Sequence, residues 1–179
     1  MKNLEIYIHI PFCVRKCEYC DFLSFPADDD AKLRYVKGLM AEMIFYGPLM
    51  KNYQVSSVYI GGGTPSSIDE QWIAALMEGV FDCFNVLPDA EISIECNPGT
   101  LSREKLLAYR DAGINRLSIG LQSANNDELK LLGRIHTFEQ FVTNYEVARN
   151  VGFKNINVDL MYGLPGQSAS QYMLSLIHI

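Results

Sequence analysis

The chain has 179 residues, of which 49% are hydrophobic and 20% charged, so it is globular by composition and long enough to bury one sizeable core. Its formal net charge of -6 and pI near 5.0 argue against non-specific nucleic-acid binding, which needs lysine and arginine to replace phosphate counterions. No apolar run reaches the roughly 20 residues that cross a bilayer, and the N-terminus lacks the pattern of a secretion signal. We therefore expect a cytoplasmic protein that acts on a small molecule or another protein.

Short apolar runs rich in β-branched residues alternate with segments of helical spacing. We predict strands over residues 4–10, 55–60, 91–96, 116–121 and 155–160. Helices are expected over 31–49 and 69–84, from Ser102 to near Gly113, from a capping box of Thr137 and Gln140 to Gly152, and from near Ser168 onward. This βαβα order predicts parallel strands joined by right-handed crossovers.

Parallel strands connected in this way form either a doubly wound sheet or a barrel of the (β/α)8 kind, and periodicity does not distinguish the two. In both architectures the reactive residues collect at the C-terminal ends of the strands. A cysteine-rich loop follows the first predicted strand, and a glycine run at 61–63 follows the second. Glu95, Gln122 and Asp159 stand at the ends of the next three, so we expect the functional site at this edge.

Three cysteines, Cys13, Cys17 and Cys20, have the spacing C-x3-C-x2-C on a loop after a strand. Three thiolates can hold three corners of a [4Fe–4S] cluster and leave the fourth iron open, and the neighbouring Arg15 and Lys16 would stabilise them. Zinc is the alternative, but structural zinc usually takes four ligands and no second cysteine pair lies nearby. We therefore predict a cluster.

The other two of the five cysteines are Cys83 and Cys96. An odd number fits a disulfide framework poorly. Cys83 falls in an apolar predicted helix and Cys96 in an apolar predicted strand. Because a free cysteine behaves as a small hydrophobe, we expect both to be buried packing residues.

The cysteine spacing after a first strand is the signature of the radical S-adenosylmethionine (SAM) superfamily, which this chain resembles. More narrowly, it is similar from about residue 4 to 166 to the oxygen-independent coproporphyrinogen III oxidase family. The matching segments are YIHIPFC at 7–13, GGGTPS at 61–66, ECNP at 95–98, GLQS at 120–123 and LGRIH at 132–136. This resemblance implies an incomplete (β/α)6 barrel, three quarters of a TIM-like barrel, with about five βα units present.

By this resemblance, the three cysteines hold a [4Fe–4S] cluster whose open iron binds SAM. The glycine loop would contact the amino group of the SAM methionine, and an arginine suits its carboxylate. The positions that match the SAM site are Tyr7, Tyr19, Gly62, Gly63, Thr64, Glu95, Gln122, Arg134 and Asp159. Taken singly, Arg134 also fits a solvated charge and Asp159 a strand-end cap. His136 has the chemistry of an axial haem ligand, yet we interpret it as a loop residue at the start of a helix.

Two activities are compatible with the resemblance. In the oxidase, an electron passed into bound SAM yields a 5′-deoxyadenosyl radical that starts decarboxylation of two propionates of coproporphyrinogen III. The oxidase has a further cysteine two residues after the third ligand, where this chain has Phe22, and an N-terminal extension that this chain does not show. Both features resemble the haem chaperone branch (HemW type), which binds haem and passes it to acceptor proteins. We expect the chaperone, with the oxidase as the alternative, and leave open whether the protein is an enzyme.

The implied partners are haem or a porphyrinogen, an electron donor such as flavodoxin or ferredoxin, and a haem-acceptor protein that would bring any peripheral membrane association. We expect residues 1–173 to form a truncated radical SAM core domain, with the C-terminal domain absent. The last six residues, LSLIHI at 174–179, match what a transposon end used in sequencing libraries encodes in one reading frame. We hypothesise that they are a non-native tail, and an ordinary apolar helix is the alternative.

Overall fold

The computed structural model describes residues 2–177, in which strands and helices alternate along the chain. The strands are β1 (Lys2–Ile10), β2 (Tyr53–Gly62), β3 (Val86–Cys96), β4 (Arg116–Gln122) and β5 (Asn155–Leu160). The α-helices are α1 (Asp29–Tyr46), α2 (Glu70–Cys83), α3 (Arg103–Asp111), α4 (Asn126–Leu131), α5 (Phe138–Asn150) and α6 (Ala169–Ile177). All five predicted strands are confirmed, with ends shifted by a few residues.

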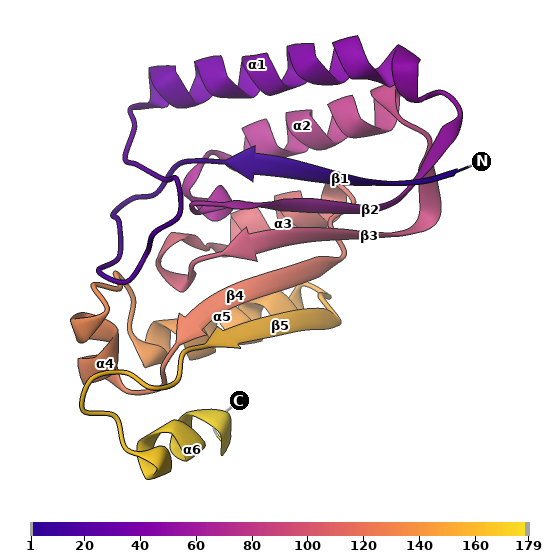
Figure 1. Cartoon of the computed structure of the whole chain (residues 1–179). Coiled ribbons are helices and arrows are strands. Elements are labelled where there is room, and N and C mark those ends of the chain that lie inside the picture. The colour runs from indigo at the N-terminus through magenta and orange to yellow at the C-terminus, as the bar shows by residue number, and fades with distance from the viewer. Residues whose placement is uncertain (1, 178–179) are drawn as a thin grey trace.

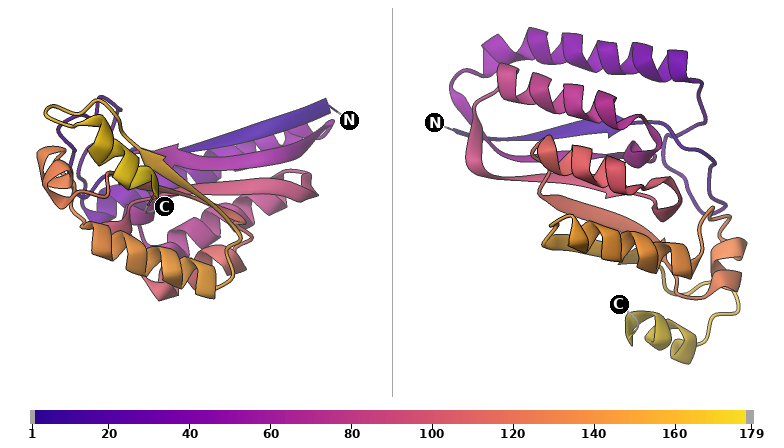
Figure 2. Two further views of the ribbon diagram at one scale, coloured as in Figure 1. Left: turned by 90° about the horizontal axis from the view of Figure 1, so that it is seen from below. Right: turned by 180° about the vertical axis from the view of Figure 1, so that it is seen from behind.

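The strands form one parallel sheet in the order β1-β2-β3-β4-β5 (Figure 1). A doubly wound sheet would reverse this order at a switch point and carry helices on both faces. Here each strand pairs with the next one in the chain, and α1, α2, α3 and α5 cover a single face (Figure 2). The strand order therefore confirms the expected partial barrel and excludes the doubly wound alternative.

The two faces of the sheet differ in chemistry because successive side chains in a strand point to opposite sides. On the helix side, Ile60, Ile94 and Leu117 are fully buried in the core. On the other side, Tyr59 pairs in register with Ser93, which pairs in turn with Arg116. The uncovered face of the sheet is therefore polar.

Hydrogen bonds at the helix starts follow the sequence signals. Asp28 caps α1 by accepting from Ala31 N at 2.7 Å. At α5, Thr137 N donates to Gln140 Oε1 at 2.9 Å and Gln140 N donates to Thr137 Oγ1 at 3.3 Å, which confirms the capping box. Such side-chain acceptors satisfy backbone donors that have no partner inside the helix.

The structure departs from the sequence predictions at several places. The predicted helix over 31–49 ends at Tyr46 and continues as a 3₁₀ turn, Gly47–Met50, because Pro48 cannot donate a backbone hydrogen bond. The short helix α4 was not predicted. Cys96 is buried as expected, whereas Cys83, at the end of α2, is only half-buried.

The end of the chain forms α6, close to the predicted start near Ser168. Of the proposed non-native tail, residues 174–177 lie in this helix, and Ser175 is buried with its Oγ accepting from Ala124 N at 3.1 Å. Residues 178 and 179 lie outside the described residues. The non-native tail therefore stays a hypothesis.

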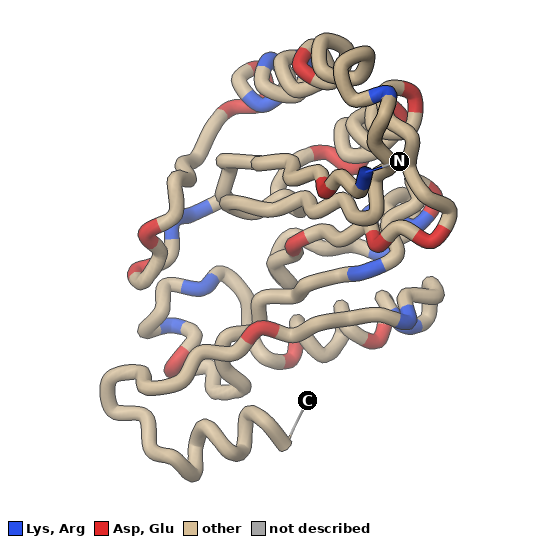
Figure 3. Tube along the Cα trace, turned by 45° about the vertical axis from the view of Figure 1, so that its right-hand side comes forward, with Lys and Arg blue, Asp and Glu red and all other residues tan. Residues whose placement is uncertain are grey.

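Charged residues are distributed along the whole trace. Figure 3 shows basic and acidic positions interspersed rather than gathered into one long basic stretch. Within residues 2–177, no helix has the length and apolar character needed to cross a membrane.

Replacing Leu117 with alanine should lower the free energy of unfolding by about 3 kcal/mol, because this fully buried side chain would leave a cavity in the core. Urea unfolding of the purified chain measures the change. Leu131→Ala is the matched control, since Leu131 is 51% exposed. Equal losses in the two variants would contradict the assigned core.

Candidate functional site

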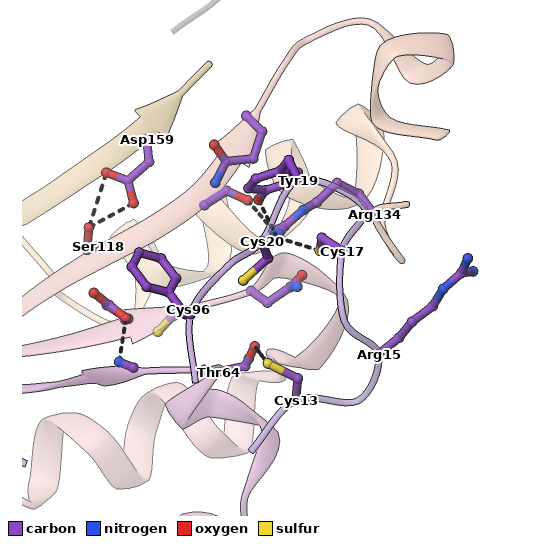
Figure 4. A pocket seen from close by; sticks show the side chains of 17 residues that line it. Cys13, Arg15, Cys17, Tyr19, Cys20, Thr64, Cys96, Ser118, Arg134 and Asp159 are labelled. Atoms are coloured by element: carbon purple, nitrogen blue, oxygen red, sulfur yellow. Dashed lines mark hydrogen bonds between the residues drawn. The ribbon is translucent and has the colours of Figure 1, made fainter. Parts of the chain in front are cut away.

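A pocket lies where the C-terminal ends of the strands meet the cysteine loop (Figure 4). All the predicted cluster and SAM residues except Tyr7 line it. They are Cys13, Cys17, Tyr19, Cys20, Gly62, Gly63, Thr64, Glu95, Gln122, Arg134 and Asp159. The fold therefore brings together residues that are up to 146 positions apart, from Cys13 to Asp159.

The cysteine loop is fastened to the rest of the chain through its backbone. Cys13 N donates to Phe25 O at 3.2 Å, and Cys20 N donates to Cys17 O at 3.1 Å. Glu18 N donates to the carbonyl of residue 132, which follows α4, at 3.1 Å. The three thiols are free and half-buried. They are thus held beside one pocket while remaining accessible to a ligand.

The glycine turn after β2 lies against this loop. A Cβ on Gly63 would come within 2.7 Å of Phe12 O and 3.0 Å of Cys13 Sγ, so only glycine fits there without displacement. Thr64 Oγ1 is 3.4 Å from Cys13 Sγ. Gly62 has a φ of +119° and its absent Cβ leaves room for the ring of His9. Gly62 and Gly63 are therefore required by the close approach of the chain's own residues, and their contact with SAM stays a prediction.

Glu95 fixes the glycine turn from β3. Its Oε2 accepts from Gly62 N at 3.0 Å and its Oε1 accepts from Tyr59 Oη at 2.8 Å. Burial, followed by the hydrogen bond to Glu95 and the charge of Glu95, raises the pKa of Tyr59, so its phenol stays protonated. A permanent donor therefore holds the carboxylate in place.

Arg134 connects the cysteine loop to β4. Its Nη2 donates to Gly120 O at 2.6 Å, and its Nη1 lies 3.7 Å from Cys17 Sγ and 3.5 Å from Tyr19 Oη. Its buried Nε finds no hydrogen-bond partner within residues 2–177. A guanidinium placed this way is not a solvated surface charge, and its positive charge beside the pocket suits an anionic ligand.

Asp159 and Gln122 complete the pocket on the β4–β5 side. Asp159 Oδ2 accepts from Ser118 Oγ at 3.2 Å, and its Oδ1 accepts from Asn157 Nδ2 at 2.7 Å. Gln122 has a φ of 72°, a left-handed conformation that is uncommon for a residue with a side chain. Backbone strain of this kind is found more often at functional sites than elsewhere.

Tyr7 lies apart from the pocket lining. Its Oη is 3.0 Å from His9 Nδ1, and its ring stacks on Tyr59 with centroids 6.2 Å apart. Tyr7 is therefore connected to the pocket through Tyr59, whose hydroxyl donates to the pocket residue Glu95.

Arg15 and Phe22, which the sequence analysis placed beside the cluster cysteines, line the pocket as well; four further lining residues were not assigned to the site, namely Cys96, Asn97, Ser118 and Gly120. For Ser118, Gly120 and Asn97, position within a strand or at its end was a signal that could have identified them. Ser118 and Gly120 share the face of β4 that Gln122 occupies, by the two-residue period of a strand. Asn97 follows Glu95 at the end of β3.

The identity and position of the possible metal-binding side chains indicate which kind of metal cofactor the pocket fits. Within residues 2–177, no three side chains of His, Cys, Asp or Glu converge on a point where a single metal ion would sit. A [4Fe–4S] cluster makes a different demand, since each thiolate binds an iron of its own. Three free thiols around one pocket, with the cationic Arg134 beside Cys17, fit such a cluster.

The chain was also compared with known proteins. The model of the radical SAM superfamily matches residues 7–176. The chain belongs to the radical SAM superfamily. Membership implies a [4Fe–4S] cluster and SAM as cofactors.

Relatives within this superfamily are the haem chaperones HemW of Escherichia coli and of Bacillus subtilis, each 40% identical to this chain. The matches cover 94% and 90% of this chain but 45% and 43% of the relatives. An oxygen-independent coproporphyrinogen-III oxidase-like protein, HemZ of B. subtilis, is 38% identical over 97% of this chain and 36% of its own length. The chain thus spans less than half the length of these curated relatives.

The solved structure of coproporphyrinogen III oxidase (HemN) from E. coli has the same fold. It superposes with a TM-score of 0.90 at 33% identity, over 99% of this chain and 41% of that chain. The radical SAM partial barrel expected from the sequence is therefore the fold of this chain.

His136 follows the pocket residue Arg134 and is only 4% exposed. Burial and then the charge of Arg134 lower the pKa of His136 to about 4, although the backbone of Leu121 acts in the opposite direction. Between about pH 4 and 6.5 the unfolded chain therefore binds more protons at this residue than the folded chain.

Stability should consequently fall as the pH is lowered through this window, and His136→Gln should remove that part of the pH dependence. Urea unfolding at a series of pH values measures the effect, and an NMR titration of the ring gives the pKa directly. Titration of His136 near 6.5, the ordinary value for histidine, would contradict this assignment.

Proposed function

We propose that this chain is the radical SAM core of a haem chaperone, a protein that binds haem and transfers it to an acceptor protein. The observation that carries the proposal is the pocket in which three cysteines and the matching polar residues meet, with Phe22 lining it instead of a further cysteine. The similarity to HemW chaperones at 40% identity supports the same assignment.

Cys13, Cys17 and Cys20 would hold the cluster, and the cluster with SAM would supply one-electron chemistry. Arg134, whose positive charge lines the pocket, would pair with an anionic group such as the SAM carboxylate. Glu95 keeps the Gly62 turn open for close approach of the ligand. Asp159, held by Ser118 and Asn157, would accept from a hydroxyl-bearing group.

The remaining predicted contacts fit the same scheme. Tyr19 is packed beside Arg134, where burial raises the pKa of its phenol and Arg134 opposes that rise, so a neutral aromatic ring would lie next to the cluster. Gln122 presents an amide to the pocket, and Gly63 with Thr64 lies against Cys13. These residues would orient SAM and keep water away from it.

A second candidate function is an oxygen-independent coproporphyrinogen III oxidase. The superposition on the E. coli oxidase and the similarity to HemZ favour it. The two proposals predict different ligands: a chaperone keeps its haem unchanged until an acceptor takes it, whereas an oxidase consumes a porphyrinogen. For the chaperone we further propose an electron donor such as flavodoxin or ferredoxin, a haem-acceptor protein as partner, and a cytoplasmic location.

Cys17→Ala should abolish cluster binding after anaerobic reconstitution of the full-length protein with iron and sulfide, because one of only three cluster thiolates is lost. Iron analysis and the absorbance of the cluster measure this. Cys83→Ala is the matched control and should keep about four irons, since Cys83 is remote from the pocket lining. One bound zinc and no iron in the wild type would contradict the proposal.

The reconstituted protein should bind haem in a one-to-one complex and leave coproporphyrinogen III unchanged in the presence of SAM and dithionite. Haem absorbance and chromatographic analysis of the porphyrins provide the two measurements. Formation of protoporphyrinogen would instead establish the oxidase. The variant Phe22→Cys introduces the further cysteine of the oxidase. If this variant also left coproporphyrinogen III unchanged, the result would count against the oxidase alternative.

A further inference from the structure

Glu128, in the first turn of α4, is a buried carboxylate outside the pocket. It is only 8% exposed, although a charged side chain is costly to bury without partners. Its side-chain hydrogen bonds are made with Ser123 and Gln167, neither of which lines the pocket. These bonds and the backbone bonds of α4 nevertheless connect Glu128 to three residues of the pocket: Gln122, Asp159 and Arg134.

The first connection runs to Gln122. Ser123, the residue after Gln122, is fully buried and donates from its Oγ to Glu128 Oε2 at 2.5 Å. The same hydroxyl accepts from Asn125 N at 2.9 Å. The left-handed turn at Gln122 is thus followed immediately by a residue that Glu128 holds in place.

The second connection runs to Asp159 through the loop after β5. Gln167 Nε2 donates to Glu128 Oε2 at 2.8 Å, while Gln167 Oε1 accepts from Gly163 N at 2.9 Å. Met161 N, two residues after Asp159, donates to Gln122 O at 2.9 Å. Glu128 therefore anchors the segment that leaves the pocket at Asp159.

The third connection runs along α4 to Arg134. The backbone carbonyl of Glu128 accepts from Leu132 N at 2.9 Å, and Arg134 N donates to Leu129 O at 2.9 Å. A shift of α4 would therefore move the guanidinium away from Cys17 and Gly120.

We propose that Glu128 is a positioning residue for SAM, because it ties the Gln122 turn, the Asp159 loop and the Arg134 segment into one rigid side of the pocket. This inference rests on the proposed SAM site. It assigns the effect to hydrogen bonding rather than to charge, since Oε2 accepts both hydrogen bonds and the buried Oε1 has no partner within residues 2–177.

That geometry predicts how substitutions differ. In Glu128→Gln, the amide oxygen can replace Oε2 and the NH₂ group can occupy the position of the unpartnered oxygen, so both hydrogen bonds survive. In Glu128→Met, a side chain of similar size accepts no hydrogen bond, and Ser123 and Gln167 lose a buried partner.

Equilibrium dialysis of SAM against the cluster-loaded full-length protein tests the inference, with iron content and the SAM-induced change in the cluster EPR signal recorded on the same samples. Glu128→Met should weaken SAM binding about tenfold or more with unchanged iron content, and Glu128→Gln should stay within about twofold of the wild type. Glu146→Met, an exposed glutamate on α5, is the control and should have no effect.

A second variant keeps the test decisive if Glu128→Met does not fold. Gln167→Glu replaces the donor to Glu128 Oε2 by a carboxylate, keeps an oxygen that can accept from Gly163 N, and should weaken SAM binding. SAM binding by Glu128→Met or Gln167→Glu equal to that of the wild type would overturn the inference alone. Failure of the wild type to bind SAM would overturn the proposed function as well.

Discussion

The in-order parallel pairing of the five strands is the constraint on which the rest of the structure depends. Because all strands run in one direction and chain neighbours are sheet neighbours, their C-terminal ends meet at one edge. The alternation of side chains then separates the core from the pocket within single strands, as Ile94 and Glu95 illustrate. A shift of one residue in the strand register would turn the core side chains toward the pocket and the pocket side chains toward the core.

Within that edge, polar contacts between neighbouring strands set the shape of the pocket before any ligand arrives. Glu95 on β3 holds the backbone of Gly62 on β2, and Arg134 joins the carbonyl of Gly120 on β4 to the cysteine loop. Groups fixed in this way do not need to be ordered when a ligand binds, so less of the binding free energy is lost to conformational entropy.

The sequence predicted the local elements well, because strand alternation, caps and glycine ends are encoded over a few neighbouring residues. The capping box of Thr137 and Gln140 is an example. The same patterns did not distinguish a barrel from a doubly wound sheet, because that choice depends on pairing between residues far apart in the chain. They also missed α4, whose six residues are too few to show helical periodicity, and with it Glu128.

In the candidate site, too, the sequence indicated the residues that belong to local patterns and missed those that depend on pairing between distant strands. The cysteine loop, the glycine turn and the strand-end residues were found because each stands at a recognisable place in a βα unit. Tyr7 was expected among them, but its ring stacks on Tyr59 and lies outside the pocket lining. Ser118 and Asn157 were missed, since their contact with Asp159 follows from the register between β4 and β5.

Cys96 also lines the pocket, but its side chain belongs to the buried core, and its Sγ donates to Ile94 O at 3.8 Å. Burial first, and then the charge of Glu95, raise the pKa of the Cys96 thiol. Since only a thiolate is a good ligand, Cys96 stays protonated and does not compete for iron. Under the proposed assignment, desolvation therefore distinguishes the buried thiol of Cys96 from the three half-buried thiols of the cysteine loop.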